Sequence, residues 1–294
     1  MSKNSSDKIK IIAIVGATAS GKTAYSIELA QKLDAEIISA DSRLVYKGMD
    51  IGTAKPTTEE QCGIPHYLID IVEPDFEYSA GLYKQQAQEI IQNIHNKRKT
   101  PIIVGGTGLY LDMLLRGYEL PNIEADNELR GKLKDMQKED LHKLLKEKDF
   151  NAAKEIDPND TKKIIRAIEL IEKTGKTLNE IRSKTESQYD VKWIGRNFER
   201  NKLYERINNR VDLMIEQGLV QETKDLINKY GKAPNIVNTI GYKEICSYLD
   251  NQCSLDTAIE TLKQNTRRYA KRQLTWFRKY EDIEWNIFPE TLKK

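Results

Sequence analysis

The chain is poor in cysteine and histidine, and it has no apolar run of membrane length. It contains three histidines and three cysteines (Cys62, Cys246 and Cys253), with no CxxC pair. An odd number of widely spaced cysteines argues against a disulfide framework and favours reduced thiols. The first eight residues, MSKNSSDK, lack the apolar segment of a signal peptide. We therefore expect a cytoplasmic protein that makes no contact with a membrane.

An excess of charge of one sign is also missing. The 47 lysines and arginines and the 45 aspartates and glutamates leave a net charge of +2. If the protein binds nucleic acid, its positive charge must therefore be concentrated locally. Such a concentration occurs in residues 266–279, TRRYAKRQLTWFRK, which predict a helix with cations on its outer side. A solvated basic helix without a ligand is the alternative interpretation.

What the sequence does contain is a glycine-rich loop between a predicted strand and a predicted helix. Residues 10–15 form an apolar run typical of a buried parallel strand, and residues 24–33 have helical spacing. Between them GATASGKT fits the phosphate-loop pattern G-x-x-x-x-G-K-[ST], although a chance match in a strand-turn-helix is the alternative. Its N–H groups and the helix N-terminus suit an anion, and its Thr hydroxyl suits Mg2+. The predicted diphosphate-binding residues are Gly16, Ala17, Thr18, Ala19, Ser20, Gly21, Lys22 and Thr23, with Thr23 as the metal ligand.

Further apolar runs predict the rest of the sheet. Residues 36–40, 66–72, 101–104 and 191–195 read as strands, whereas residues 79–96 and 203–230 read as helices. The predicted fold class is α/β, a P-loop NTPase-like parallel sheet flanked by helices. Densely charged helical patterns in residues 119–189 indicate a helical insertion domain, so the core comprises residues 1–118 and 190–294.

Polar residues follow two of these strands directly. Asp41 and Ser42 come after the second strand, and the turn GGTG at 105–108 comes after the fourth. Ligands of open α/β folds bind at the carboxyl edge of the sheet, where both segments are expected. The glycines would let the backbone or the Thr107 hydroxyl approach a ligand, although a tight strand-to-helix connection would also use glycine.

Eight segments resemble the bacterial tRNA dimethylallyltransferases, in the order of that family and over nearly the whole chain. They are GATASGKT (16–23), DSRLVYKGMDIGTAKP (41–56), GIPHYLIDI (63–71), GGTGLY (105–110), DPNDTKKIIRAIE (157–169), LYERINNRVD (203–212), IGYKE (240–244) and TRRYAKRQLTWFR (266–278). The resemblance implies transfer of a dimethylallyl group from dimethylallyl diphosphate to N6 of adenosine 37, beside the tRNA anticodon. It implies Mg2+ as cofactor and the tRNA anticodon stem-loop as partner, and we expect a monomer.

The resemblance also implies roles for individual residues. Asp41 is the general base, Lys22 and Thr23 neutralise the leaving diphosphate, and Arg210 is the transition-state arginine, with Arg206 as the alternative. Because the base must reach the adenine amine, base flipping is implied. The implied tRNA contacts are Asp41, Ser42, Arg43, Leu44, Thr107, Arg130, Lys162, Lys163, Ile164, Ile165 and Arg166.

The chain departs from the family pattern at several positions. Leu44 replaces a glutamine in the segment expected to contact the target base, and Lys163 replaces an arginine. Leucine makes no side-chain hydrogen bond, and lysine lacks the bidentate geometry of arginine. Ala17, Tyr67 and Asp157 are further departures. Two other functions compete with the prenyltransferase: a kinase that uses ATP, and a non-catalytic RNA-binding protein in which the loop is a nucleotide switch.

Overall fold

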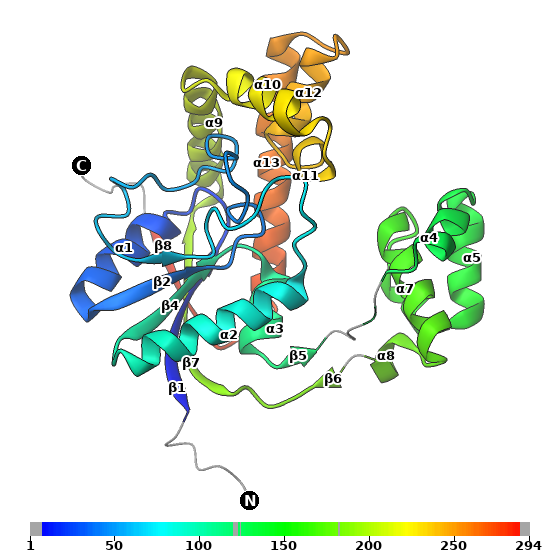
Figure 1. Ribbon diagram of the computed structural model, residues 1–294, viewed down its shortest axis with the longest axis horizontal. Coiled ribbons are helices and arrows are strands. Elements are labelled where there is room, and N and C mark those ends of the chain that lie inside the picture. Colours follow the sequence, from blue (N-terminus) through cyan, green and yellow to red (C-terminus); the bar gives the residue numbers. More distant parts are fainter. Residues whose placement is uncertain (1–7, 120–122, 124, 182, 289–294) are drawn as a thin grey trace, which may run out of the picture. The chain divides into compact units, whose positions relative to one another are not determined.

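The chain divides into two compact units in the computed structural model, which describes residues 8–119, 123, 125–181 and 183–288 (Figure 1). The first unit is formed by Met1–Leu115 and Gln188–Lys294 together, and the second by Arg116–Ser187. The sequence places the insertion at residues 119–189. None of the helices in the described residues is long and apolar enough to cross a membrane.

The first unit is built on a parallel sheet of six strands, in the order β3-β2-β4-β1-β7-β8. This confirms the predicted α/β class with helices flanking a parallel sheet (Figure 1). The strands are β1 (Ile9–Gly16), β2 (Ala35–Ser39), β3 (His66–Tyr67), β4 (Thr100–Gly105), β7 (Tyr189–Phe198) and β8 (Ile283–Phe288). The helices are α1 (Lys22–Leu33), α2 (Ala80–Asn96), α3 (Gly108–Leu115), α9 (Arg200–Glu216), α10 (Leu219–Tyr230), α11 (Pro234–Val237), α12 (Tyr242–Leu249) and α13 (Leu255–Phe277).

The central strand β1 is buried on both faces because successive side chains point to opposite sides of the sheet. Ile14 packs with Ile27 and Ala30 of α1 on one face. Ile11, Ala13 and Val15 belong to the larger cluster on the other face, to which α2 and α3 contribute. The continuous apolar run of β1 is therefore what a strand between two helical layers requires.

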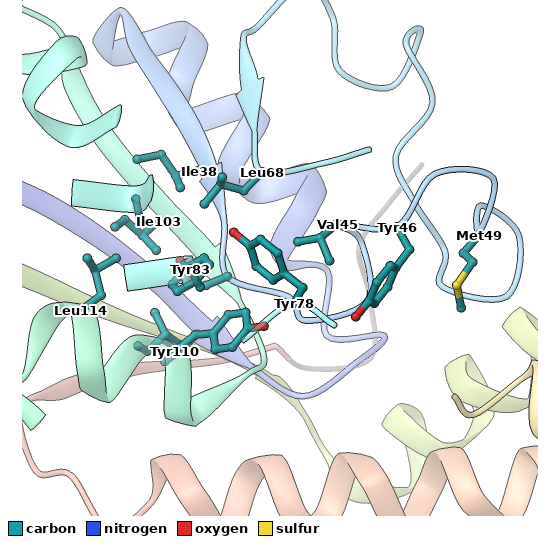
Figure 2. Packing of buried hydrophobic residues seen from close by; sticks show 14 of the residues in the cluster. Ile38, Val45, Tyr46, Met49, Leu68, Tyr78, Tyr83, Ile103, Tyr110 and Leu114 are labelled. Carbon is teal, nitrogen blue, oxygen red and sulfur yellow. The ribbon is translucent and has the colours of Figure 1, made fainter. Parts of the chain in front are cut away.

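The larger cluster also holds the segment that follows β2. Val45, Tyr46 and Met49 are fully or almost fully buried and belong to the same cluster as Tyr78, Tyr83 and Tyr110 (Figure 2). The rings of Tyr83 on α2 and Tyr110 on α3 stack with centroids 4.1 Å apart. The segment after Asp41 is thus anchored in the core rather than extended into solvent.

Three features of the first unit differ from the sequence prediction. The strand expected at 66–72 is only two residues long, since Leu68 and Asp70 adopt positive φ angles of 61° and 54°. The helix expected at 203–230 is two helices, α9 and α10, because Gly218 has a φ of 102° at the start of α10. The sixth strand, β8, was not predicted and pairs in parallel with β7.

The second unit is helical and has its own core. Its elements are β5 (Tyr118–Glu119), α4 (Asn127–Lys134), α5 (Lys138–Lys148), α6 (Phe150–Glu155), α7 (Thr161–Thr174), α8 (Leu178–Ile181) and β6 (Ser183–Lys184). Leu133, Leu141, Leu145 and Ile168 are among the residues that meet in that core. The Asp160 carboxylate caps α7 by accepting from the Lys163 N–H, and Gly175 ends the helix with a φ of 65°.

Candidate functional site

The phosphate loop connects β1 to α1 at the carboxyl edge of the sheet. Gly16 has a φ of 147°, and a Cβ there would lie 2.2 Å from the carbonyl oxygen of Arg196 on β7. Gly21 caps α1 in the left-handed conformation, with a φ of 78°. Glycine is required at both ends because neither position accommodates a side chain without strain. The loop therefore has the backbone geometry that its sequence predicts.

The ammonium of Lys22 lies across this loop and donates a hydrogen bond of 2.5 Å to the Ala17 carbonyl oxygen. Burial lowers the pKa of Lys22 to about 7, the Asp41 carboxylate counteracts this effect, and the Arg210 guanidinium adds to it. The structure thus places Asp41 and Arg210 close enough to Lys22 to act on its charge. A bound anion would restore the ordinary pKa of Lys22, because an opposite charge stabilises the ammonium.

The two predicted arginines of α9 have different surroundings. The Arg206 Nε donates to the Ala19 carbonyl oxygen at 2.9 Å, and its guanidinium lies over the Phe198 ring. Arg210 makes no hydrogen bond or ion pair within the described part of the chain, and burial followed by repulsion from Arg206 lowers its pKa. A half-buried guanidinium without a counter-ion is suited to an anionic ligand. The geometry therefore favours Arg210 over Arg206 as the residue that meets the diphosphate.

Asp41 is held at the edge of the sheet by backbone contacts. Its Oδ1 accepts from the Arg43 N–H at 2.9 Å, and the next residue, Ser42, donates its N–H to the Thr107 hydroxyl at 3.0 Å. The Thr107 N–H donates to the Ala40 carbonyl oxygen at 3.1 Å. A Cβ at Gly105 would lie 2.1 Å from that same oxygen. The structure therefore brings Asp41, Ser42 and Thr107 together, as the sequence predicts.

Three side chains at this edge were missed by the sequence analysis. Gln273 of α13 accepts a hydrogen bond from the Thr18 N–H at 2.8 Å and donates one to the Gly106 carbonyl oxygen at 3.1 Å. Tyr269, one turn earlier, lies near Thr107 and Asp41; burial and the Asp41 carboxylate raise the pKa of its phenol. Trp276 donates its indole N–H to the buried Asp112 carboxylate at 3.1 Å. All three come from the basic segment predicted as a nucleic-acid surface, so that helix also contributes side chains to the edge of the sheet.

Two other residues predicted to contact tRNA lie in the segment that follows Asp41. Arg43 donates from its Nη1 to the Asn235 Oδ1 at 3.3 Å. The Leu44 carbonyl oxygen accepts from the Asp70 N–H at 3.0 Å, while its side chain is half-buried. Backbone bonds of this kind fix the path of the segment whatever side chain stands at position 44.

The residues predicted to contact tRNA in the second unit differ in their exposure. Lys162 and Lys163 are exposed on α7, where Lys163 forms an ion pair of 2.7 Å with the Asp160 carboxylate. Arg130 and Arg166 both bind the fully buried Glu169 carboxylate: Arg130 through two bonds of 2.9 Å and Arg166 through one of 2.5 Å. Burial would raise the pKa of Glu169, but these arginines and the Asp126 N–H hold it at about 2.

Ile164 and Ile165 do not fit the prediction of a tRNA contact through their side chains. They are 0% and 8% exposed and pack in the core of the second unit. A helix buries one face only, so the alternation of these isoleucines with Lys162, Lys163 and Arg166 already separates an inner from an outer face.

A magnesium ion would find few protein ligands here. Among the described residues no group of three or more His, Cys, Asp or Glu side chains could hold a metal ion. Thr23 is exposed at the start of α1, and the fully buried Ser20 hydroxyl has no hydrogen-bond partner in the described residues. Mg2+ bound to a diphosphate keeps most of its ligands from phosphate oxygens and water. The Thr23 and Ser20 hydroxyls thus fit an ion delivered with the diphosphate.

Comparison with known proteins identifies the family of this chain. A model of the family described as IPP transferase matches residues 44–280. The chain is 48% identical over 285 residues to a tRNA dimethylallyltransferase of Macrococcus caseolyticus, covering 95% of this chain and 91% of the relative. The chain belongs to the IPP transferase family. A relative from Acetivibrio thermocellus with the same name is 49% identical over 283 residues, covering 94% of this chain and 90% of the relative.

Solved structures of IPP transferases share the fold. The tRNA isopentenylpyrophosphate transferase of Bacillus halodurans superposes with a TM-score of 0.73 at 44% identity, covering 95% of this chain and 90% of that chain. A eukaryotic dimethylallyltransferase, whose structures capture it acting on tRNA, superposes with a TM-score of 0.80 at 31% identity. That match covers 95% of this chain and 74% of the eukaryotic one.

Proposed function

We propose that this chain is a tRNA dimethylallyltransferase, which transfers a dimethylallyl group from dimethylallyl diphosphate to N6 of adenosine 37 in tRNA and releases diphosphate. Membership of the IPP transferase family supports the reaction class. The observation that carries the assignment to this site is the placement of Asp41 at the same edge of the sheet as the phosphate loop, where Lys22 lies near both Asp41 and Arg210. Together they provide two cations for a leaving anion and one base for a nucleophile.

The diphosphate would be held by residues Gly16 to Thr23. Its charge grows as the allylic carbon–oxygen bond breaks, so donors that are already in place stabilise the transition state most. Lys22 and Arg210 serve this role because burial has removed water that would otherwise solvate them. Bound Mg2+, held at the Thr23 and Ser20 hydroxyls and by the diphosphate itself, would supply further neutralisation of the leaving group.

Asp41 would act on the adenine side. As the N6 nitrogen forms its bond to the allylic carbon, the carbon–oxygen bond to diphosphate breaks and N6 loses a proton. The Asp41 carboxylate accepts that proton. Its Oδ1 already accepts from the Arg43 N–H, which fixes the orientation of the carboxylate and leaves Oδ2 for the amine.

The RNA contacts are proposed for each unit separately. Near Asp41, the segment Ser42, Arg43 and Leu44 with Thr107 would contact the nucleotide that carries the target adenine. In the second unit, Lys162 and Lys163 would meet phosphates directly. Arg130 and Arg166 would do so with guanidinium groups that Glu169 holds in place. We further propose that the protein acts on tRNA as a monomer in the cytoplasm. Molar-mass measurement of the free protein and of the tRNA complex would check the monomer, and cell fractionation would check the location.

Transfer of label from dimethylallyl diphosphate to an unmodified anticodon stem-loop, with Mg2+ and without ATP, tests the proposal. Incorporation at N6 of the adenosine beside the anticodon is the expected result. A stem-loop with guanosine at that position is the matched control and should take up no label. If no label enters RNA, and a parallel reaction supplied with ATP shows phosphoryl transfer to a hydroxyl acceptor, the protein is a kinase and Asp41 is the base for that acceptor.

A further inference from the structure

Gln273 is a polar side chain buried inside the protein, and both ends of its amide are used. Only 5% of it is exposed. Its Oε1 accepts from the Thr18 N–H in the phosphate loop, and its Nε2 donates to the Gly106 carbonyl oxygen in the loop after β4. One amide therefore connects the loops that follow two neighbouring strands of the sheet, β1 and β4.

The loop after β4 is shaped to receive side chains of α13. A Cβ at Gly106 would lie 2.0 Å from the Gln273 Nε2, and a Cβ at Gly108 would lie 2.3 Å from the Trp276 ring. These separations are far below van der Waals contact, so a larger residue at either position would displace the side chain of α13 that packs there. Gly106 and Gly108 therefore make room for side chains of α13.

The same loop holds the segment that carries Asp41. Thr107 follows Gly106 and binds both Ala40, through its N–H, and Ser42, through its hydroxyl. A continuous series of bonds thus runs from Thr18 through Gln273 and Gly106–Thr107 to the residues on either side of Asp41. Its two ends are the leaving-group site and the base of the proposed reaction.

We propose that Gln273 is a positioning residue that sets the distance between the diphosphate loop and Asp41; this role rests on the proposed prenyl transfer. Gln273 occupies the Thr18 N–H, so that donor is not offered to the substrate in the ground state. Holding two reacting groups in register acts on the chemical step, and a displacement of about 1 Å can cost about 100-fold in rate. Gln273 acts through Thr18 and Gly106, and it touches no substrate atom in this scheme.

The direct test is Gln273→Met, which keeps the side-chain volume and removes both hydrogen bonds. We expect kcat for prenyl transfer to fall about 30-fold, within the range set by misplacement of reacting groups. The dissociation constant for dimethylallyl diphosphate should change less than threefold or decrease, because the Thr18 N–H loses its bond to Gln273 and can donate to the ligand. Gln92→Met, on the exposed side of α2, is the matched control and should leave both quantities unchanged.

A second variant disturbs the same amide by changing the residue that it contacts in the loop after β4. Gly106→Ala places a methyl group where the Gln273 Nε2 lies and should reproduce the loss in kcat. The double variant Gly106→Ala with Gln273→Met should be no slower than either single variant, since both remove one connection. This comparison remains informative if one single variant folds poorly, because kcat is taken per molecule that binds dimethylallyl diphosphate.

Four outcomes would contradict the proposal. Unchanged kcat per binding-competent molecule with a lower melting temperature would make Gln273 a purely structural residue. A higher dissociation constant for dimethylallyl diphosphate at unchanged kcat would show that Gln273 contributes to substrate binding instead. Multiplicative losses in the double variant would show that Gly106 and Gln273 act independently. Absence of transfer by the wild-type protein would instead overturn the proposed function, and the role of Gln273 with it.

Discussion

Binding of the diphosphate should be accompanied by uptake of a proton at Lys22. Burial lowers the pKa of this ammonium to about 7 in the free protein, from an ordinary value of 10.5. A diphosphate beside it reverses the penalty, because the charged form then has a counter-ion. At pH 8 the free protein holds the proton on about one molecule in ten, and the complex on nearly all. We therefore expect uptake of about 0.9 proton per bound ligand.

The pH dependence of affinity follows from the same quantities. At pH 7 half of the free protein is deprotonated at Lys22, so uptake falls to about 0.5 proton. Above pH 7 the association constant should fall with pH, and the fall approaches a factor of ten per pH unit. The association constant at pH 9 should therefore be about 50-fold lower than at pH 7. Titration of the ligand itself contributes little to the proton uptake over this range, because the last pKa of a phosphate ester is about 6.

Isothermal titration of dimethylallyl diphosphate without tRNA measures the uptake directly. At pH 8 the observed enthalpy should vary with the ionisation enthalpy of the buffer, with a slope of about 0.9 proton. Lys22→Arg is the matched control, since a guanidinium keeps its charge at this pH and should reduce the slope to near zero. A wild-type slope near zero at pH 8 would refute the reasoning, since Lys22 would then be protonated before the ligand binds.

The other predictions concern catalysis and stability. Asp41→Asn should lower kcat for prenyl transfer about 1,000-fold and leave dimethylallyl diphosphate bound, as single-turnover assays and titration would show; near-normal turnover would exclude Asp41 as the base. Arg210→Gln should lower kcat about 100-fold and reduce proton uptake at pH 8, because repulsion that lowers the pKa of Lys22 is removed; unchanged uptake would contradict this. Glu222→Ala should cost about 3 kcal/mol in urea unfolding, against under about 0.5 kcal/mol for the exposed control Glu216→Ala, because Glu222 accepts from three backbone N–H groups and the Tyr242 hydroxyl.

The pKa of Lys22 also has a consequence for the free protein. Its pKa is lower in the folded than in the unfolded chain, so between pH 7 and 10.5 the unfolded chain binds more protons. The contribution of Lys22 to the free energy of unfolding therefore rises with pH through that window. Binding of diphosphate reverses this preference, which is why the affinity and the stability of the free protein respond to pH in opposite directions.

The parts of the site that sequence predicted are those encoded within a few residues. The phosphate loop depends on Gly16, Gly21 and Lys22, which stand in one motif between a strand and a helix. Asp41 could be placed at the same edge because it follows a parallel strand. The roles of Gln273 and Glu222 were not predicted, because each acts on backbone groups more than 160 residues away in the chain.

Other differences arise from tertiary context, or from local signals that the sequence does contain. The strand β8, IEWNIF, is short and alternates polar with apolar residues, so its pairing with β7 is a property of the sheet. By contrast, Gly218 marks the break between α9 and α10 in the sequence itself. The burial of Ile164 and Ile165 was also readable, from the helical spacing of their apolar neighbours.

The loop GGTG at 105–108 shows why local sequence left its meaning open. Glycine was expected there either for a ligand or for a tight connection, and both interpretations concern the loop alone. The groups packed against the loop explain the glycines instead. A side chain at Gly105 would clash with the Ala40 carbonyl, one at Gly106 with Gln273, and one at Gly108 with Trp276. The remaining residue, Thr107, is the one whose side chain can reach Ser42, and therefore Asp41. Because the three glycines have no side chains, α13 and the end of β2 can pack closely against this loop. Thr107 can then bind Ala40 and Ser42, so the glycines help to position the base, Asp41.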